Sequence, residues 1–195
     1  MIASRDRRPR ADTLIRVIEL RPLLAADLPA VARWLREPHV ARWWLAGTTA
    51  EAELAGMAAV VAEPAGQATR LLTVLHREPE QEGATRIGWC QWYPYDAYTQ
   101  EAAAIGARAG ECGIDYAIGE RDAIGRGHGT ELIAVLVEEL RRHHPGCGVI
   151  ADPDARNLAS RRVLERNNFS LVTVRPVSSE PTDDPMAIYR LAAES

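Results

Sequence analysis

The stretch that most limits how this chain can fold is "GIDYAIGERDAIGRGHGTELIAVLV", residues 113–137. It begins as an apolar, strand-like segment, passes through glycines at positions 125, 127 and 129, and continues as an amphipathic helix. The apolar stripe of that helix consists of Leu132, Ile133, Leu136, Val137 and Leu140. Unpaired backbone N–H groups and the helix dipole favour an anion at such a junction. The stretch therefore predicts a phosphate site or, as the simpler alternative, a tight turn that uses glycine for positive φ.

The glycine loop does not match two common phosphate-binding patterns. No Gly-Lys-Ser/Thr ending follows, as a P-loop NTPase requires. The loop also comes after several expected strands, whereas the dinucleotide fingerprint normally follows the first strand of its fold. We therefore expect a pyrophosphate-bearing cofactor other than ATP or NAD. The expected cofactor-binding residues of the loop are Gly125, Arg126, Gly127, His128, Gly129 and Thr130.

The remaining segments predict one α/β (α+β) domain over residues 13–195, preceded by a disordered basic tail at residues 1–12. Strands are expected at 14–20, 69–77, 86–95, 111–119, 148–154, 169–177 and 186–192. Further helices are expected at 26–38, 49–63 and 157–169, with Asp27 as N-cap of the first and a loop at 97–109. This order predicts a central, mixed, mostly antiparallel sheet flanked by helices.

Composition argues against several other classes of protein. The net charge of -4 gives no basic surplus to neutralise phosphates, so no nucleic-acid partner is expected, and an acidic surface suits a cationic small molecule. No signal peptide and no run of about 18 apolar residues is present, so we expect a cytoplasmic protein without a membrane partner. The three cysteines are widely spaced without a CxxC pair and are expected to be buried thiols, with no metal site.

Two motifs resemble the GCN5-related N-acetyltransferase (GNAT) family. The family's acetyl-coenzyme A loop reads Arg/Gln-x-x-Gly-x-Gly/Ala, and "IGRGHG" supplies Gly127 and Gly129 but has Ile124 at the first position. The second motif is Asn-x-x-Ala/Ser-x-x-x-Tyr-x-x-x-Gly-Phe, whose positions hold Asn157, Ser160, Leu164, Asn168 and Phe169. The resemblance implies a GNAT fold, acetyl-coenzyme A as cofactor, no metal, and Asn157 among the cofactor-binding residues.

Leu164 departs from the tyrosine that often protonates the leaving thiolate in this family, because leucine cannot donate a proton. Tyr116 or water is a possible substitute, although packing is the favoured role for Tyr116. A thiol leaves readily as its anion near neutral pH, so transfer without that acid is conceivable. Asn168 in place of glycine is a mild change, since both residues accept the left-handed conformation that ends a helix.

Four segments, "LREPHVARWW", "GWCQWY", residues 113–137 and "DPDARNLASRRVLERNNF", are similar to those of the aminoglycoside 6'-N-acetyltransferases. This resemblance covers about residues 15–177 and implies direct acetyl transfer to a polycationic antibiotic. Asp115 and Asp152 would bind its amines, Trp43 or Trp44 would wall the pocket, and Asp115 would be the leading base. A backbone N–H near Tyr116 to Ile118 would polarise the thioester carbonyl.

The strand at residues 86–95 places Trp89, Gln91 and Tyr93 on one face and Cys90 and Trp92 on the other. We expect one face to belong to the core and the other to the pocket, and we assign Gln91 and Tyr93 to the pocket.

Two other functions remain open on the sequence. A siderophore-type acyltransferase acting on lysine or hydroxylysine resembles this region too, but its relatives tend to place histidine where this chain has Asp115. A non-catalytic acyl-coenzyme A sensor is conceivable because of Leu164. Either a monomer or a homodimer is compatible with the sequence.

Overall fold

The sheet of this protein has seven strands in the order β1-β2-β3-β4-β5-β7-β6. The computed structural model describes residues 17–78, 83–177 and 184–193, and the expected tail at 1–12 lies outside them. The strands are β1 Ile18–Pro22, β2 Arg70–His76, β3 Thr85–Pro94, β4 Cys112–Ile118, β5 Val149–Ala151, β6 Ser170–Arg175 and β7 Met186–Leu191. The helices are α1 Leu28–Trp34, α2 Pro38–Trp44, α3 Ala50–Ala62, α4 Thr99–Ile105, α5 His128–His143 and α6 Leu158–Arg166.

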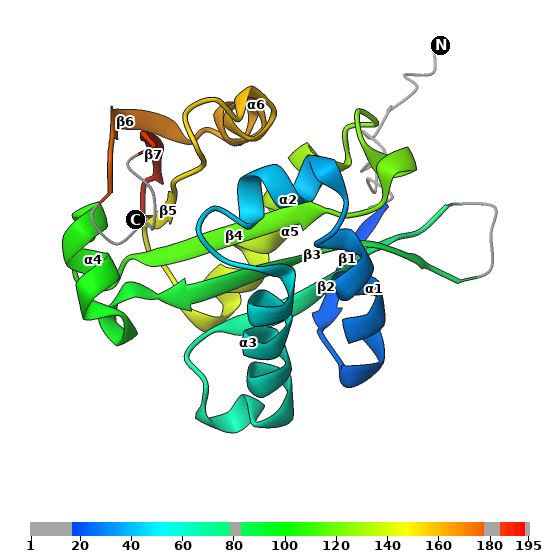
Figure 1. Ribbon diagram of the computed structural model, residues 1–195. Coiled ribbons are helices and arrows are strands. Elements are labelled where there is room, and N and C mark those ends of the chain that lie inside the picture. The colour runs from blue at the N-terminus through cyan, green and yellow to red at the C-terminus, as the bar shows by residue number, and fades with distance from the viewer. Residues whose placement is uncertain (1–16, 79–82, 178–183, 194–195) are drawn as a thin grey trace, which may run out of the picture.

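The strand pairing confirms the expected mixed, mostly antiparallel sheet. Only β4 and β5 pair in parallel among the named strands of the described chain, and they do so over two residue pairs, Cys112 with Val149 and Gly113 with Ile150. Beyond Gly113, β4 continues to Ile118 paired with β3, without a strand partner on its β5 side in the described part of the chain. The sheet is therefore open between β4 and β5, as the separation of the two ribbons in Figure 1 illustrates.

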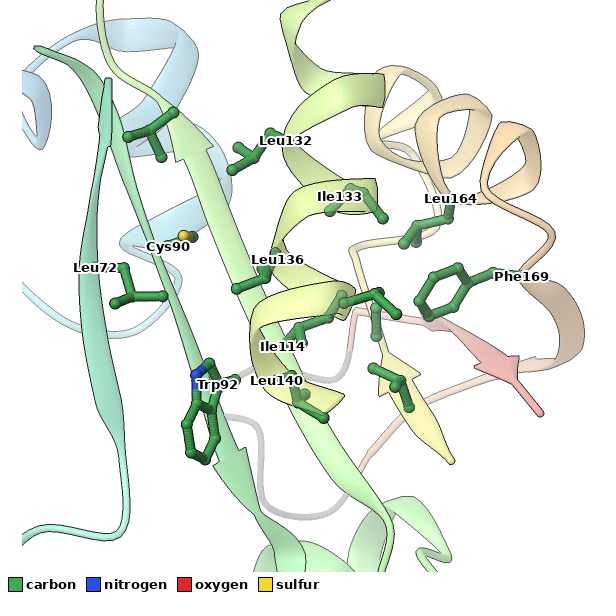
Figure 2. Packing of buried hydrophobic residues seen from close by; sticks show 14 of the residues in the cluster. Leu72, Cys90, Trp92, Ile114, Leu132, Ile133, Leu136, Leu140, Leu164 and Phe169 are labelled. Atoms are coloured by element: carbon green, nitrogen blue, oxygen red, sulfur yellow. The ribbon is translucent and has the colours of Figure 1, made fainter. Parts of the chain in front are cut away.

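Helices cover both faces of the sheet (Figure 1). Helices α1, α2 and α3 pack on one face, where Trp34 and Leu71 contribute to a buried cluster with Trp89. Helix α5 packs on the other face, and its predicted stripe is fully part of the core there. Figure 2 shows Leu136 of this helix pointing toward the sheet, in which β3 carries both Cys90 and Trp92. Strand β3 is thus buried on both faces around Trp89 and Cys90, because each face has its own helical layer.

Two short helices were not expected from the sequence. Residues 97–109 were assigned to a loop, but they contain α4, whose "TQEAAAI" is rich in helix formers. Helix α2 begins at Pro38, a favourable first helical residue, and follows α1 after a gap of three residues. Each helix has seven residues, about two turns, which is too short to display a clear apolar period.

Asp27 precedes α1 as expected, but the prediction that its side chain caps this helix is wrong. Its carboxylate accepts hydrogen bonds from both guanidinium nitrogens of Arg21 at 2.6 and 2.8 Å, from Arg86 at 3.1 Å and from Thr73 at 3.0 Å. The backbone N–H of Leu24 donates a further bond at 2.9 Å. The bonds from the two guanidinium groups are stronger than a cap to a neutral backbone N–H, because both partners of each bond are charged. They therefore hold the carboxylate away from the first turn of α1. The pKa of Asp27 is lowered, chiefly by the bond from Arg21.

Several local predictions concern residues in or next to the core. Cys90, Cys112 and Cys147 are buried free thiols, and burial raises the pKa of each. Asn168 has φ 63°, the left-handed conformation expected after α6. Leu164 is fully buried in the cluster behind α5, close to Phe169 in Figure 2.

Candidate active site

A cleft of about 690 Å³ lies where β4 and β5 diverge. It brings together all but two of the candidate residues, although they come from segments more than 100 positions apart. Those that line it are Trp43, Trp44, Gln91, Tyr93, Asp115, Tyr116, Ile118, Gly125, Gly127, Gly129, Thr130, Asp152 and Asn157. Arg126 and His128 are the two that do not line it.

The glycine loop leaves its backbone open to the cleft. Gly125 and Gly127 have φ of 76° and 89°, and a Cβ added to either would meet no atom within 4 Å. Gly127 is the N-cap of α5, so N–H groups of the first turn of this 16-residue helix are available to an anion. A Cβ at Gly129 would instead lie 3.4 Å from Val163 of α6. The sequence left a tight turn and a phosphate site as alternatives, and the loop has the features of both. Its exposed backbone fits a pyrophosphate.

The side chains of Arg126 and His128 have other surroundings. The His128 ring lies 4.3 Å from the ring of His76 on β2. Its pKa is lowered, first by burial and then by the charge of His76. A cofactor-binding role for these two side chains stays a prediction, since neither one reaches the wall of the cleft.

Asp115 lies on β4 directly opposite Gln91 of β3, and the Gln91 amide donates to its Oδ2 at 2.7 Å. Burial raises the pKa of Asp115, while hydrogen bonds from Gln91 and Tyr93 oppose that rise and the charge of Glu53 adds to it. No ion pair joins Asp115 to an arginine in the described ranges, and the whole chain contains no lysine. The carboxylate therefore faces the cleft without a cationic partner of its own.

The glycine of the Gly-Ile-Asp segment has a packing role. A Cβ at Gly113 would lie 2.4 Å from Cε2 of Tyr93, so only glycine leaves room for this ring. The Tyr93 ring packs edge-on against Tyr95 at 5.4 Å and Tyr98 at 5.5 Å. The position of Tyr93 beside Asp115 thus depends on Gly113.

Helices α2 and α3 form the opposite wall. Trp44 packs edge-on against Trp89 at 4.7 Å, and its indole N–H donates to Glu53 at 3.1 Å. The Arg42 guanidinium lies 4.6 Å from the centre of the Trp43 ring. Glu53 was not predicted as a site residue, because nothing in the pattern of α3 distinguishes it from a solvated glutamate.

Acidic side chains dominate the charged residues of the cleft. The carboxylates that line it belong to Glu53, Glu101, Asp115, Asp152 and Asp154. Asp154 is neutralised by Arg156, whose Nη2 lies 2.6 Å from its Oδ2. The lining arginines are Arg42 and Arg166.

Tyr116 of β4 and Ser160 of α6 form a hydroxyl pair in the wall of the cleft. Their oxygens are 2.6 Å apart, and both residues line the cleft. Burial raises the pKa of Tyr116, so its phenol keeps its proton near neutral pH. Leu164, which occupies the family's tyrosine position, is buried in the core and does not line the cleft. Ser160 was not predicted as a site residue, because the motif accepts any small side chain at its position.

Asn157 and Ile118 line the cleft and also make hydrogen-bond contacts within the fold. The Asn157 side chain caps α6 by accepting from the N–H of Ser160 at 3.2 Å. The carbonyl of Ile118 lies 3.1 Å from Nε2 of His39. The first contact fixes the start of α6, and the second joins α2 to β4.

The described residues offer neither a metal-binding group nor a membrane-spanning helix. They contain no group of three or more His, Cys, Asp or Glu side chains arranged to hold a metal ion. Within those same ranges, none of the helices has both the length and the apolar character to cross a bilayer.

Comparisons with known proteins agree with this geometry. Residues 18–170 match the family described as Acetyltransferase (GNAT) domain. The proteins named Aminoglycoside N(6')-acetyltransferase type 1 from Klebsiella pneumoniae and from Serratia marcescens are each 28% identical over 160 residues, covering 78% of this chain and 73% of the relative.

Solved structures of AAC(6')-Ib share the fold. Its complex with coenzyme A has a TM-score of 0.66 at 22% identity and covers 90% of this chain and 94% of that chain. Its complex with ribostamycin and coenzyme A has a TM-score of 0.67 at 22% identity and covers 90% and 93%. Since the family match spans most of the sequence, the chain belongs to the GNAT acetyltransferase family and is an acetyl-coenzyme A-dependent N-acetyltransferase.

Proposed function

We propose that this enzyme acetylates the 6'-amine of an aminoglycoside antibiotic and thereby confers resistance to it. The observation that carries the proposal is Asp115, a carboxylate set into the wall of the cleft without a cationic partner among the described residues. Such an acid is costly to keep ionised, so its presence favours a ligand that brings positive charge.

The surroundings of Asp115 suit a polycation. Glu53, Glu101 and Asp152 line the same cleft, and an aminoglycoside presents several ammonium groups that these carboxylates would attract and orient. The rings of Trp43 and Tyr93 give aromatic walls, which suit both sugars and cations. The two curated relatives are named for acetylation of the 6'-amine of aminoglycosides, which supports the same acceptor.

Protons must leave the amine and reach the sulfur. When bound, acetyl-coenzyme A supplies the acetyl group as a thioester. The reacting ammonium would first pass a proton to Asp115, directly or through water, because only the neutral amine has a lone pair for the acetyl carbon. Its second proton would leave as the amide forms and the carbon–sulfur bond breaks. The raised pKa of Asp115 makes it a better proton acceptor than an ordinary aspartate. The Tyr116 and Ser160 pair is our candidate for donating a proton to the sulfur, in place of the buried Leu164.

Neomycin and paromomycin provide a matched test, because they differ in carrying an amine or a hydroxyl at the 6' position. We expect acetyl-coenzyme A turnover with neomycin, one acetyl group mapped to its 6'-amine by mass spectrometry and NMR, and little turnover with paromomycin. Equal acetylation of both antibiotics would place the reaction at another amine. A preference for lysine or hydroxylysine over neomycin would support the siderophore-type alternative instead.

A further inference from the structure

The cofactor end of the cleft lacks the side chain that the family motif normally provides. Ile124 stands where Arg or Gln is typical, lines the cleft, and is 47% exposed. An isoleucine cannot form a hydrogen bond to a phosphate oxygen. If the coenzyme phosphates receive a side-chain contact, another residue must supply it.

Arg166 lines the same cleft as Ile124. Its helix, α6, packs against the first turn of α5: the Asn167 amide donates to the carbonyl of Thr130 at 3.0 Å, and a Cβ at Gly129 would touch Val163. Arg166 is the last residue of α6, three positions after Val163, so both lie on the same side of the helix. Both residues line the cleft.

The guanidinium of Arg166 is available to a ligand. No hydrogen bond or ion pair joins it to another residue in the part of the chain that the structure describes, and it is exposed to solvent. The other lining arginine, Arg42, already lies over the ring of Trp43 on the acceptor wall. Of the two arginines that line the cleft, Arg166 is therefore the one without such a contact among the described residues.

We propose that Arg166 binds a phosphate group of coenzyme A and replaces the side-chain contact that Ile124 cannot make. Arginine suits this role because its planar fork can donate two hydrogen bonds to one phosphate. The proposal rests on coenzyme A binding at the loop of residues 125–130, and it does not depend on which amine is acetylated.

The test is calorimetric titration of the enzyme with coenzyme A in the absence of acceptor. Arg166→Gln is expected to raise the Kd about tenfold, the effect of losing a solvent-accessible charge-assisted contact. Arg162→Gln is the matched control, because it removes the same charge from an exposed position of α6 that does not line the cleft. Its Kd should change less than about twofold. Equal effects of the two variants would overturn the proposal, since they would reflect net charge alone.

Dephospho-coenzyme A identifies the phosphate involved. If Arg166 contacts the 3'-phosphate, Arg166→Gln should weaken coenzyme A but leave dephospho-coenzyme A unchanged. If it contacts the pyrophosphate, the variant should weaken both ligands to the same degree. If the Arg166→Gln variant bound both ligands with the same Kd as the wild-type enzyme, the proposed contact would be wrong.

A rescue experiment tests whether an arginine at position 124 can take over the contact of Arg166. Ile124→Arg, introduced into the Arg166→Gln variant, should recover most of the lost affinity because residue 124 is exposed and lines the same cleft. Failure of this rescue in a variant with an unchanged melting temperature would contradict the idea that the two positions serve one phosphate. Since no acceptor is present, these results stay separate from the outcome of the antibiotic assay.

Discussion

Two carboxylates of this molecule, Asp27 and Asp115, have opposite electrostatic surroundings. Asp27 is 1% exposed and is held by the guanidinium groups of Arg21 and Arg86, which lower its pKa. Asp115 receives hydrogen bonds from the neutral residues Gln91 and Tyr93, and burial raises its pKa. The counter-charge of Asp27 is built into the fold, whereas that of Asp115 is left for a ligand to provide.

The position of each acid in the sheet explains its surroundings. Asp27 joins β1, β2 and β3 through Arg21, Thr73 and Arg86, so its contacts lie within the closed part of the sheet. Asp115 lies on β4 beyond its last pair with β5, where the sheet is open. A closed sheet can supply partners from neighbouring strands, and an open one leaves a side chain facing a cleft.

The largest effect is expected for Asp27→Ala. The side chains of Arg21 and Arg86 are 33% and 45% exposed and keep part of their hydration, so losing the bonds to Asp27 should lower the free energy of unfolding by about 3 kcal/mol in urea titrations. The contribution of Asp27 should be fully present above the pKa of an unfolded aspartate and be lost as pH falls toward its lowered folded pKa. The kcat of the enzyme that remains folded should be unchanged. A stable Asp27→Ala protein with defective catalysis would contradict the structural role.

Asp115→Asn should give the reverse pattern. Losing a charge-assisted bond to a substrate ammonium is expected to lower kcat/KM for neomycin by about 10- to 150-fold, or roughly 1.5–3 kcal/mol, and further if Asp115 is also the base. The Kd for coenzyme A, measured by calorimetry, should stay near the wild-type value. Glu53→Gln serves as a comparison, because Glu53 is a lining carboxylate on the opposite wall. Full activity of Asp115→Asn would remove the main support for the antibiotic acceptor.

The glycine loop and the helix after it could be predicted well from sequence, because they depend on backbone conformation and an apolar period. Positive φ at Gly125 and Gly127 and the apolar stripe of α5 leave clear local patterns. The side chains of Arg126 and His128 are the exception, and they do not line the cleft, since sequence position does not tell which way a loop side chain points.

The walls of the cleft around Asp115 could be predicted only in part. Gly-Ile-Asp indicated Asp115, but Glu53 and the partnership of Tyr116 with Ser160 depend on contacts between distant elements. Helix α3 was expected over residues 49–63, but α2, which carries Trp44 toward Glu53, was missed because its seven residues show no clear apolar period. Leu164 was recognised as a departure, yet its burial in the core could be learned only from packing.

A smaller effect is expected for Tyr116→Phe, which removes the hydroxyl next to Ser160 while keeping the ring. A thiol is a good leaving group near neutral pH, so an acid aids its departure only modestly, and we expect kcat to fall about three- to tenfold. Coenzyme A binding should not change. An unaltered kcat would assign Tyr116 to packing, and Ser160→Ala would then show whether the serine hydroxyl acts alone.

The smallest effect concerns stability at the open edge of the sheet. A folded pKa above the ordinary 3.8 means that ionised Asp115 lowers stability at neutral pH, the opposite sign to Asp27. Asp115→Asn should therefore melt at or above the wild-type temperature at pH 7, by about 2–4 °C for each kcal/mol relieved. Below the ordinary pKa both states carry the proton, so this difference should vanish as the pH is lowered toward about 4.

Melting curves of both proteins across that pH range would test the contrast between the two acids. The amide oxygen that the Asp115→Asn substitution introduces can still accept from Gln91, so loss of that hydrogen bond should not obscure the result. A lower melting temperature for Asp115→Asn at pH 7 would mean that the carboxylate anchors Gln91 and Tyr93 as part of the fold. Asp115 would then resemble Asp27, and only the kinetic effect of the substitution would support the proposal that it binds the acceptor.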